Sequence, residues 1–172
     1  MLNHKSYIMK KYILLIVIIF ASCAEQKQEP ETAGYSIRGE EESYMIGSDE
    51  TTDFIRKWAD AHNKRDMESI LSMEKTDIKI ELPDGTVING QDEHSKVLES
   101  FFANNVTWKP YWILPYNSVK AQETWVIAGF ALTSNVDGEE NVILHMGDIQ
   151  LEDGLVSRII VYENQRPKKS NN

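Results

Sequence analysis

Cysteine is the residue that this chain has least of, because Cys23 is the single one among 172 residues. The sequence can therefore form no internal disulfide, and no cluster of thiolates can hold a metal ion. No Glu-x-x-His or His-x-x-x-His pair is present, and there is no glycine-rich phosphate loop and no serine-centred turn. The sequence thus contains no motif typical of metal hydrolases, nucleotide-binding enzymes or serine or cysteine hydrolases. No metal or cofactor is expected.

Positive charge is also scarce. Lysine and arginine number 18 against 27 aspartates and glutamates, which gives a formal net charge of −9. An acidic protein is repelled by phosphate backbones and by anionic lipid, so nucleic acid is not an expected partner.

Long apolar runs are absent as well. The longest is Tyr12–Phe20, about nine residues, whereas a helix needs roughly 20 to cross a bilayer. Lysines precede this run and two small residues follow it, which is the layout of a secretory signal.

The stretch Phe20-Ala-Ser-Cys23 resembles the lipobox of bacterial lipoproteins, with Phe20 in place of the usual leucine. In that family the cysteine sulfur receives a diacylglyceryl group, the preceding peptide is removed and the new amino terminus is acylated. The resemblance implies a signal peptide over residues 1–22 and a lipid anchor at Cys23 in the cell envelope. Ala24, where some systems use aspartate for inner-membrane retention, favours the outer membrane. An ordinary signal with a stray cysteine and an uncleaved anchor are the alternatives.

Cleavage before Cys23 would make the charge more lopsided, because it removes three lysines and no acid. The mature body would carry 15 basic and 27 acidic residues, a net charge of −12. Residues 23–47 are polar and acidic without apolar periodicity, which predicts a flexible linker. The sequence thus predicts an acidic body held away from the membrane on a tether.

The folded part is predicted over residues 48–165, with a polar tail at 166–172. Apolar spacing of three and four predicts a helix over 50–64, a short one capped by Asp66, and a third over 91–104. Alternation predicts a strand at 78–82, and the Asp84-Gly85 turn predicts a short partner at 86–88. The later runs predict strands at 106–118, 122–134, 141–151 and 155–163, with Asp137-Gly138 and Asp153-Gly154 as turns between the last three. Two prolines suit 106–118 to a sheet edge or a bulged strand. The order predicts an α+β fold in which a curved antiparallel sheet wraps three helices as a cone with one open end.

Two of the late strands are apolar on both faces, although the helices can cover only one. Residues 125–132 and 142–146 show this most clearly, with Trp125, Ile127, Leu144 and Met146 expected on the convex face. A homodimer through that face is the simplest explanation. Cover by the linker or by residues 106–118 is the alternative.

These elements resemble the nuclear-transport-factor-2-like superfamily in its SnoaL-like branch. The matching stretches are Phe54–Asp66, Asp77–Leu82, Asn89-Gly90, Leu151–Val156 and Val161–Glu163. The resemblance implies a conical pocket behind the helices and frequent dimerisation through the convex face. Its members include isomerases, cyclases, dehydratases and pocket domains of unknown chemistry, so the fold does not decide the function.

The ketosteroid-isomerase branch needs a carboxylate base and an acidic pair of oxyanion donors. The resemblance puts Trp58 where the donor tyrosine sits, Leu82 at the base and Gly147 at the donor aspartate. Leucine cannot take a proton and glycine has no side chain, so that catalytic set is not expected here. Asp148, one residue further along its strand, is expected to point away from the pocket.

The predicted pocket residues are Trp58, His62, Leu82, Phe130, His145, Gly147, Ile159 and Glu163. His145 is the candidate general base, since it is a titratable group among apolar neighbours; a structural histidine bonded to Glu163 or to a backbone carbonyl is the other interpretation. His62 has the same two interpretations. His94 is expected on a helix face near solvent.

Three functions stay open. A pocket that binds a small apolar ligand or a protein segment is favoured over an enzyme of the isomerase, cyclase or dehydratase type that uses His145. The third is a structural lipoprotein whose cone is filled by its own side chains.

The lipobox interpretation predicts that Cys23→Ser abolishes labelling by radioactive palmitate, because no other thiol can accept the lipid. Labelling of the expressed full chain, followed by membrane fractionation, checks this. A Ser22→Ala variant is the matched control, since it keeps both the small residue and the thiol. Undiminished labelling of Cys23→Ser would contradict the lipobox.

Overall fold

The computed structural model describes residues 31–36, 42–136 and 138–164, which form three helices and eight strands. The predicted signal peptide, Cys23 and the tail at 166–172 lie outside the described residues. In chain order the elements are β1 (Ala33–Ser36), β2 (Glu42–Ile46), α2 (Asp49–Lys64), α3 (Met67–Ser72), β3 (Glu74–Glu81), β4 (Val87–Asn89), α4 (Gly90–Ala103), β5 (Thr107–Ser118), β6 (Thr124–Val136), β7 (Glu139–Glu152) and β8 (Leu155–Asn164). None of the helices in these ranges is long and apolar enough to cross a bilayer.

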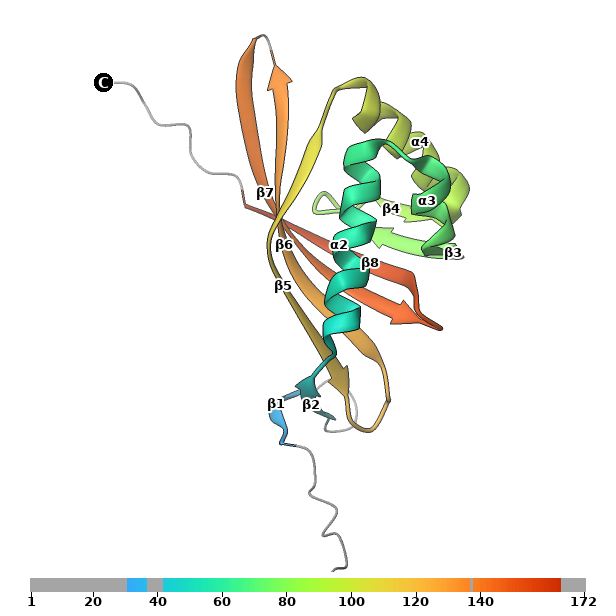
Figure 1. Cartoon of the computed structure of the whole chain (residues 1–172), viewed down its shortest axis with the longest axis vertical. Coiled ribbons are helices and arrows are strands. Elements are labelled where there is room, and N and C mark those ends of the chain that lie inside the picture. The colour runs from blue at the N-terminus through green and yellow to red at the C-terminus, as the bar shows by residue number, and fades with distance from the viewer. Residues whose placement is uncertain (1–30, 37–41, 137, 165–172) are drawn as a thin grey trace, which may run out of the picture. The chain divides into compact units, whose positions relative to one another are not determined.

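All eight strands belong to one sheet, in the order β1-β2-β5-β6-β7-β8-β3-β4. The sheet curves around the helices, as Figure 1 shows. The predicted α+β class is therefore confirmed, with one correction to the all-antiparallel sheet. β3 pairs with β8 in parallel, while the other neighbours are antiparallel. β3 lies beside β8, the last strand of the meander, and runs in the same direction. The long segment that joins the two strands in sequence includes α4.

Regular structure begins earlier than the predicted start near Ser48. β2 adds to the end of β5, with Tyr44 opposite Ser118, and β1 pairs with β2. The Glu42 carboxylate accepts hydrogen bonds from the backbone N–H groups of Val119, Lys120 and Ala121 at 2.8–3.0 Å, and these bonds, that of Lys120 first, lower its pKa. β2 is short and follows acidic residues, so its sequence shows no clear apolar alternation. Its strand conformation depends on pairing with β5.

The first two predicted helices are confirmed, and local capping explains their ends. The Ser48 hydroxyl accepts a hydrogen bond from the Thr51 N–H at 3.3 Å at the start of α2. Arg65 ends α2 in the left-handed conformation, with a φ of 58°. The Asp66 carboxylate then accepts from the Ser69 N–H at 3.1 Å, which begins α3.

The core lies between the helices and the concave face of the sheet. Alternate residues of β6 are buried there, and Ile55 and Trp58 of α2 pack against them. The β6 residues are Val126, Ala128, Phe130 and Leu132. Strand periodicity therefore separates an inner face from an outer one, as the sequence predicted.

One predicted turn and the predicted bulged strand are also confirmed. Asp153 and Gly154 both have positive φ, 54° and 77°, as the two central residues of a type I′ hairpin turn require. A β-bulge lies between Pro110 and Trp112 of β5, opposite β6. Asp137, in the third Asp-Gly pair, lies outside the described residues.

The outer face carries a row of large side chains across four paired strands. Trp112 of β5, Gly129 of β6, Met146 of β7 and Tyr162 of β8 are successive partners in register. Trp112, Met146 and Tyr162 are exposed by 39%, 40% and 49%. A Cβ at Gly129 would lie 2.3 Å from Trp112 Nε1 and 2.5 Å from the Tyr111 ring, so the missing side chain makes room for both rings.

Candidate functional site

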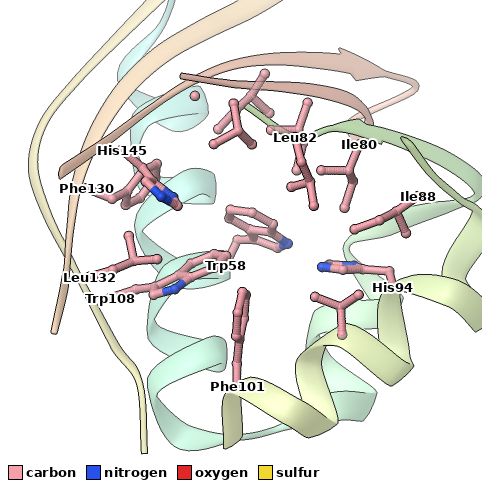
Figure 2. A pocket seen from close by; sticks show the side chains of 15 residues that line it. Trp58, Ile80, Leu82, Ile88, His94, Phe101, Trp108, Phe130, Leu132 and His145 are labelled. Carbon is pink, nitrogen blue, oxygen red and sulfur yellow. The ribbon is translucent and has the colours of Figure 1, made fainter. Parts of the chain in front are cut away.

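A cavity lies between the helices and the concave face of the sheet, and side chains from every element of the core line it (Figure 2). The helices contribute Trp58, His94, Val97 and Phe101. The strands and the residue after β3 contribute Ile80, Leu82, Ile88, Trp108, Phe130, Leu132, His145, Gly147, Ile149, Ile159 and Val161. Apart from two histidines and the indole N–H groups, this lining offers no polar side-chain atom.

The cavity is small. Its volume is about 70 Å³, and the empty space is about 640 Å³ when open solvent at the mouth is counted. Pockets that enclose a drug-sized molecule span roughly 300–1,000 Å³. The cavity is thus too small to enclose a whole molecule of that size.

Six of the eight predicted pocket residues line this cavity, and two do not. Trp58, Leu82 and Gly147, the positions singled out by the superfamily resemblance, share it with Phe130, His145 and Ile159. Glu163 follows Val161 by two residues on β8, close to the end of that strand, and is not among the lining residues. His62 lies instead in a buried cluster beneath Trp58, since it is one helical turn further along α2.

His145 and Glu163 form a pair at the cavity wall. They are partners in the β7–β8 register, and His145 Nε2 lies 3.3 Å from Glu163 Oε2. The two side chains are 20% and 23% exposed, so water reaches both. A carboxylate beside an imidazole can orient the ring and stabilise the imidazolium that forms when the ring accepts a proton, which is an arrangement that a general base uses.

Asp148 points to the other face, as predicted from strand alternation. Its neighbours Gly147 and Ile149 line the cavity, whereas its carboxylate accepts a hydrogen bond from the Tyr116 hydroxyl at 2.9 Å. Half-burial raises the pKa of Asp148, and burial next to that carboxylate also raises the pKa of Tyr116. Asp148 therefore cannot replace the carboxylic acid that Gly147 lacks.

A buried carboxylate, Glu74, lies behind the cavity at the start of β3. Its Oε1 accepts a hydrogen bond from Trp58 Nε1 at 2.9 Å, and its Oε2 lies 3.0 Å from His94 Nδ1. The side chains of Glu74 and His94 are 0% and 4% exposed. The expectation that His94 lies near solvent was wrong, because α4 packs on β3 and turns this residue inward.

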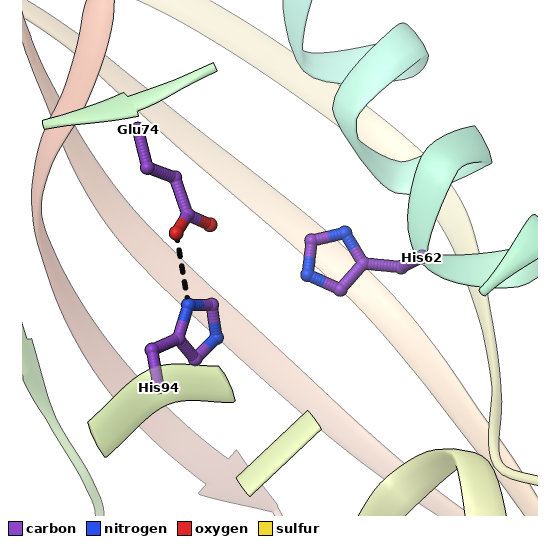
Figure 3. A group of neighbouring side chains, drawn as sticks. All are labelled: His62, Glu74 and His94. Atoms are coloured by element: carbon purple, nitrogen blue, oxygen red, sulfur yellow. Dashed lines mark hydrogen bonds and ion pairs between the residues drawn. The ribbon is translucent and has the colours of Figure 1, made fainter. Parts of the chain in front are cut away.

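His62 completes the cluster (Figure 3). Its Nδ1 lies 2.7 Å from the Trp58 carbonyl oxygen, and its ring stacks on Trp108 with centroids 4.4 Å apart. Its Nε2 is buried and has no hydrogen-bond partner among the residues that the structure describes. Burial lowers the pKa of His62 to about 3, against the effect of the Trp58 carbonyl, so the ring is neutral near pH 7.

Glu74 and His94 are the site residues that sequence reasoning missed. Glu74 is separated from the strand pattern that began at Asp77, and an isolated glutamate usually lies in solvent. A signal was nevertheless present, since His94 follows the apolar face of α4 one turn before Val97 and Leu98.

Comparison with solved structures shows that this is a nuclear-transport-factor-2-like fold. A ketosteroid isomerase homologue from Kribbella flavida matches with a TM-score of 0.58 and 19% identity, over 74% of this chain and 87% of that one. A polyketide cyclase homologue from Xanthomonas campestris gives 0.54 and 15%, over 66% and 90%. An NTF2-like protein of unknown function from Cytophaga hutchinsonii gives 0.51 and 15%, over 70% and 95%. No protein-family model matches the sequence, and neither does any curated protein.

The low pKa of His62 predicts a loss of stability in mild acid. In the unfolded chain the ring titrates near 6.5, so below that pH unfolding takes up a proton that the folded protein excludes until about pH 3. The free energy of unfolding should lose up to about 1.4 kcal/mol per pH unit from this group across that window, and nothing above it.

Urea denaturation between pH 7.5 and 4.5 measures this effect. His62→Gln should show a smaller pH dependence, by about one proton, than the unsubstituted protein. His145→Gln, whose ring is partly exposed, is the matched control and should not show this reduction. Equal pH dependence in His62→Gln and the unsubstituted protein would contradict the assignment.

Proposed function

We propose that this protein is a lipid-anchored protein of the cell envelope whose SnoaL-like domain binds a small apolar ligand, or an apolar segment of a partner, in the cavity. The observation that carries the proposal is the almost wholly apolar lining, which opens to solvent at one end. Such a lining stabilises an apolar group by removing it from water.

The size of the cavity limits the ligand. A cavity of about 70 Å³ accepts only a small group, so the ligand would insert one apolar end and leave the rest in the mouth. A chain or a side chain meets this requirement better than a fused-ring molecule. A cone filled by its own side chains would leave no room for such an insertion.

The cavity lacks the acid–base set of the isomerase-like relatives. Leu82 and Gly147 line it where the resemblance would require a carboxylate base and an acidic donor. The nearest other acid on β7, Asp148, faces away. Binding without isomerase chemistry is therefore the better supported function.

The membrane part of the proposal rests on the sequence. Cys23 follows a short export signal, and two or more acyl chains suffice for stable anchoring. Because the sheet already begins with β1, the tether between Cys23 and the domain is shorter than the predicted linker of 23–47.

A dehydratase-, cyclase- or isomerase-type enzyme is the second candidate. It is favoured by one observation, the His145–Glu163 pair at the cavity wall. In that case His145 would remove a proton from a substrate in the mouth, and Glu163 would stabilise the imidazolium that forms.

We further propose that two copies associate through the outer face of the sheet. The row of Trp112, Met146 and Tyr162 is continuous across β5, β7 and β8 and is exposed, as is Leu114 by 45%. An exposed apolar row of this kind can pack on a second identical row about a two-fold axis.

If the cavity binds a ligand, Gly147→Val is expected to prevent that ligand from binding. A Cβ at this position would lie 3.5 Å from Ile149 and 3.8 Å from Ile159, which is ordinary contact, and the added methyl groups would fill the enclosed space. Native mass spectrometry of protein isolated from its own host should show a retained small molecule that falls by about tenfold or more in the variant.

Met146→Val is the control, because it places the same valine side chain at the neighbouring position, on the opposite face of the sheet and outside the cavity. Thermal unfolding within a few degrees of the unsubstituted protein would show that both variants fold. Equal retention by Gly147→Val, or no retained molecule in any of the proteins, would refute binding in this cavity.

The proposed dimer predicts that Tyr162→Glu gives a monomer, because it places a charge within an apolar contact. Light scattering at micromolar concentration on residues 32–172, the unit that holds all eight strands, measures this. Ser100→Glu, on the exposed face of α4, adds the same charge away from the row and should stay dimeric. A monomeric unsubstituted protein would remove the proposal.

A further inference from the structure

Three elements far apart in sequence bring two imidazoles and one carboxylate together behind the cavity. His62 comes from α2, Glu74 from β3 and His94 from α4, and one potential ligand atom of each lies within 4.8 Å of the others. Figure 3 shows the two rings and the carboxylate turned toward a common space. All three side chains are buried.

His62 presents an unused lone pair to this space. Its Nδ1 is close enough to the Trp58 carbonyl oxygen to donate its proton there, which leaves Nε2 as the unprotonated nitrogen. Within the described part of the chain, that buried Nε2 has no hydrogen-bond partner. Neutral imidazole nitrogen with one tautomer fixed by a backbone carbonyl is the form in which histidine binds metal.

Glu74 supplies a buried negative charge with no buried lysine or arginine near it. Among the described residues, the buried polar or charged side chains are His62, Glu74, His94 and Ser118. Trp58 Nε1 already orients one carboxylate oxygen, and the other oxygen faces His94. An oriented carboxylate next to two imidazoles is a ligand set with its outer support already in place.

We propose that His62, Glu74 and His94 form a binding site for one divalent transition-metal ion. Two nitrogen donors and one carboxylate oxygen suit Zn²⁺ or Fe²⁺ and not Ca²⁺ or Mg²⁺, which take oxygen ligands. Donors about 2.0–2.2 Å from an ion lie at most about 4.4 Å apart, so the side chains must approach by a few tenths of an ångström or more.

Three protein donors leave a coordination position for water or for a ligand group. His94 and Trp58 also line the cavity, so this position is adjacent to the proposed ligand site. The ion would also tie α2, α4 and β3 together. The inference does not depend on the proposed function, because metal binding can be measured on protein without any ligand.

The test uses the full chain in detergent, without a polyhistidine tag and after treatment with a chelator. Calorimetric titration with Zn²⁺ alone should give one ion per chain, and Co²⁺ alone should give visible absorption bands typical of four-coordinate nitrogen and oxygen ligands. His62→Gln and Glu74→Gln should each weaken Zn²⁺ binding by about 100-fold or more.

The matched control is the double variant His4→Gln, His145→Gln, which removes the other two histidines of the sequence and should bind as the unsubstituted protein does. Circular dichroism checks that each variant folds. If the single variants unfold, the unsubstituted protein and the double variant still decide the question. No binding of Zn²⁺ or Co²⁺ by the unsubstituted protein, or loss of binding in the double variant, would overturn the proposal.

Discussion

The arrangement of the domain depends on one buried carboxylate. Glu74 stands at the first residue of β3 and accepts from Trp58 of α2 while it contacts His94 of α4. A buried hydrogen-bond acceptor with partners on both helices adds directional contacts to the hydrophobic packing of α2 and α4. The same contacts hold the Trp58 side chain in the lining of the cavity. This carboxylate therefore contributes to the shape of the site.

Two glycines show how the sheet serves both of its faces. Gly147 leaves open space on the concave side, where nearby atoms are at ordinary contact distance from an imagined Cβ. Gly129, on the neighbouring strand, leaves room on the outer side that Tyr111 and Trp112 occupy. The missing side chain of Gly147 leaves room for the cavity, and that of Gly129 leaves room for two aromatic rings on the outer face. The proposed ligand site and the proposed dimer surface are therefore set by the same alternation of side chains.

The sequence was sufficient to predict the fold but not the buried cluster. A period of three to four predicted α2 and α4, a period of two predicted β3, and the Asp153-Gly154 pair predicted its turn, because each of these signals is local. β1, β2 and the parallel pairing of β3 with β8 depend on partners distant in the chain. The same holds for the burial of Glu74. In the sequence this residue looks like one more exposed charge, and its burial is evident only once the fold brings His94 and Trp58 beside it.

The parallel pairing of β3 with β8 also bears on how the chain reaches this structure. β3 is the first strand after the helical start, and the neighbour that covers its inner edge ends at Asn164. The core cannot close until nearly the whole chain is available, which makes closure late and slow compared with local contacts. A chain threaded across a membrane from its amino terminus would thus remain unfolded during passage, and it would complete its sheet only on the far side.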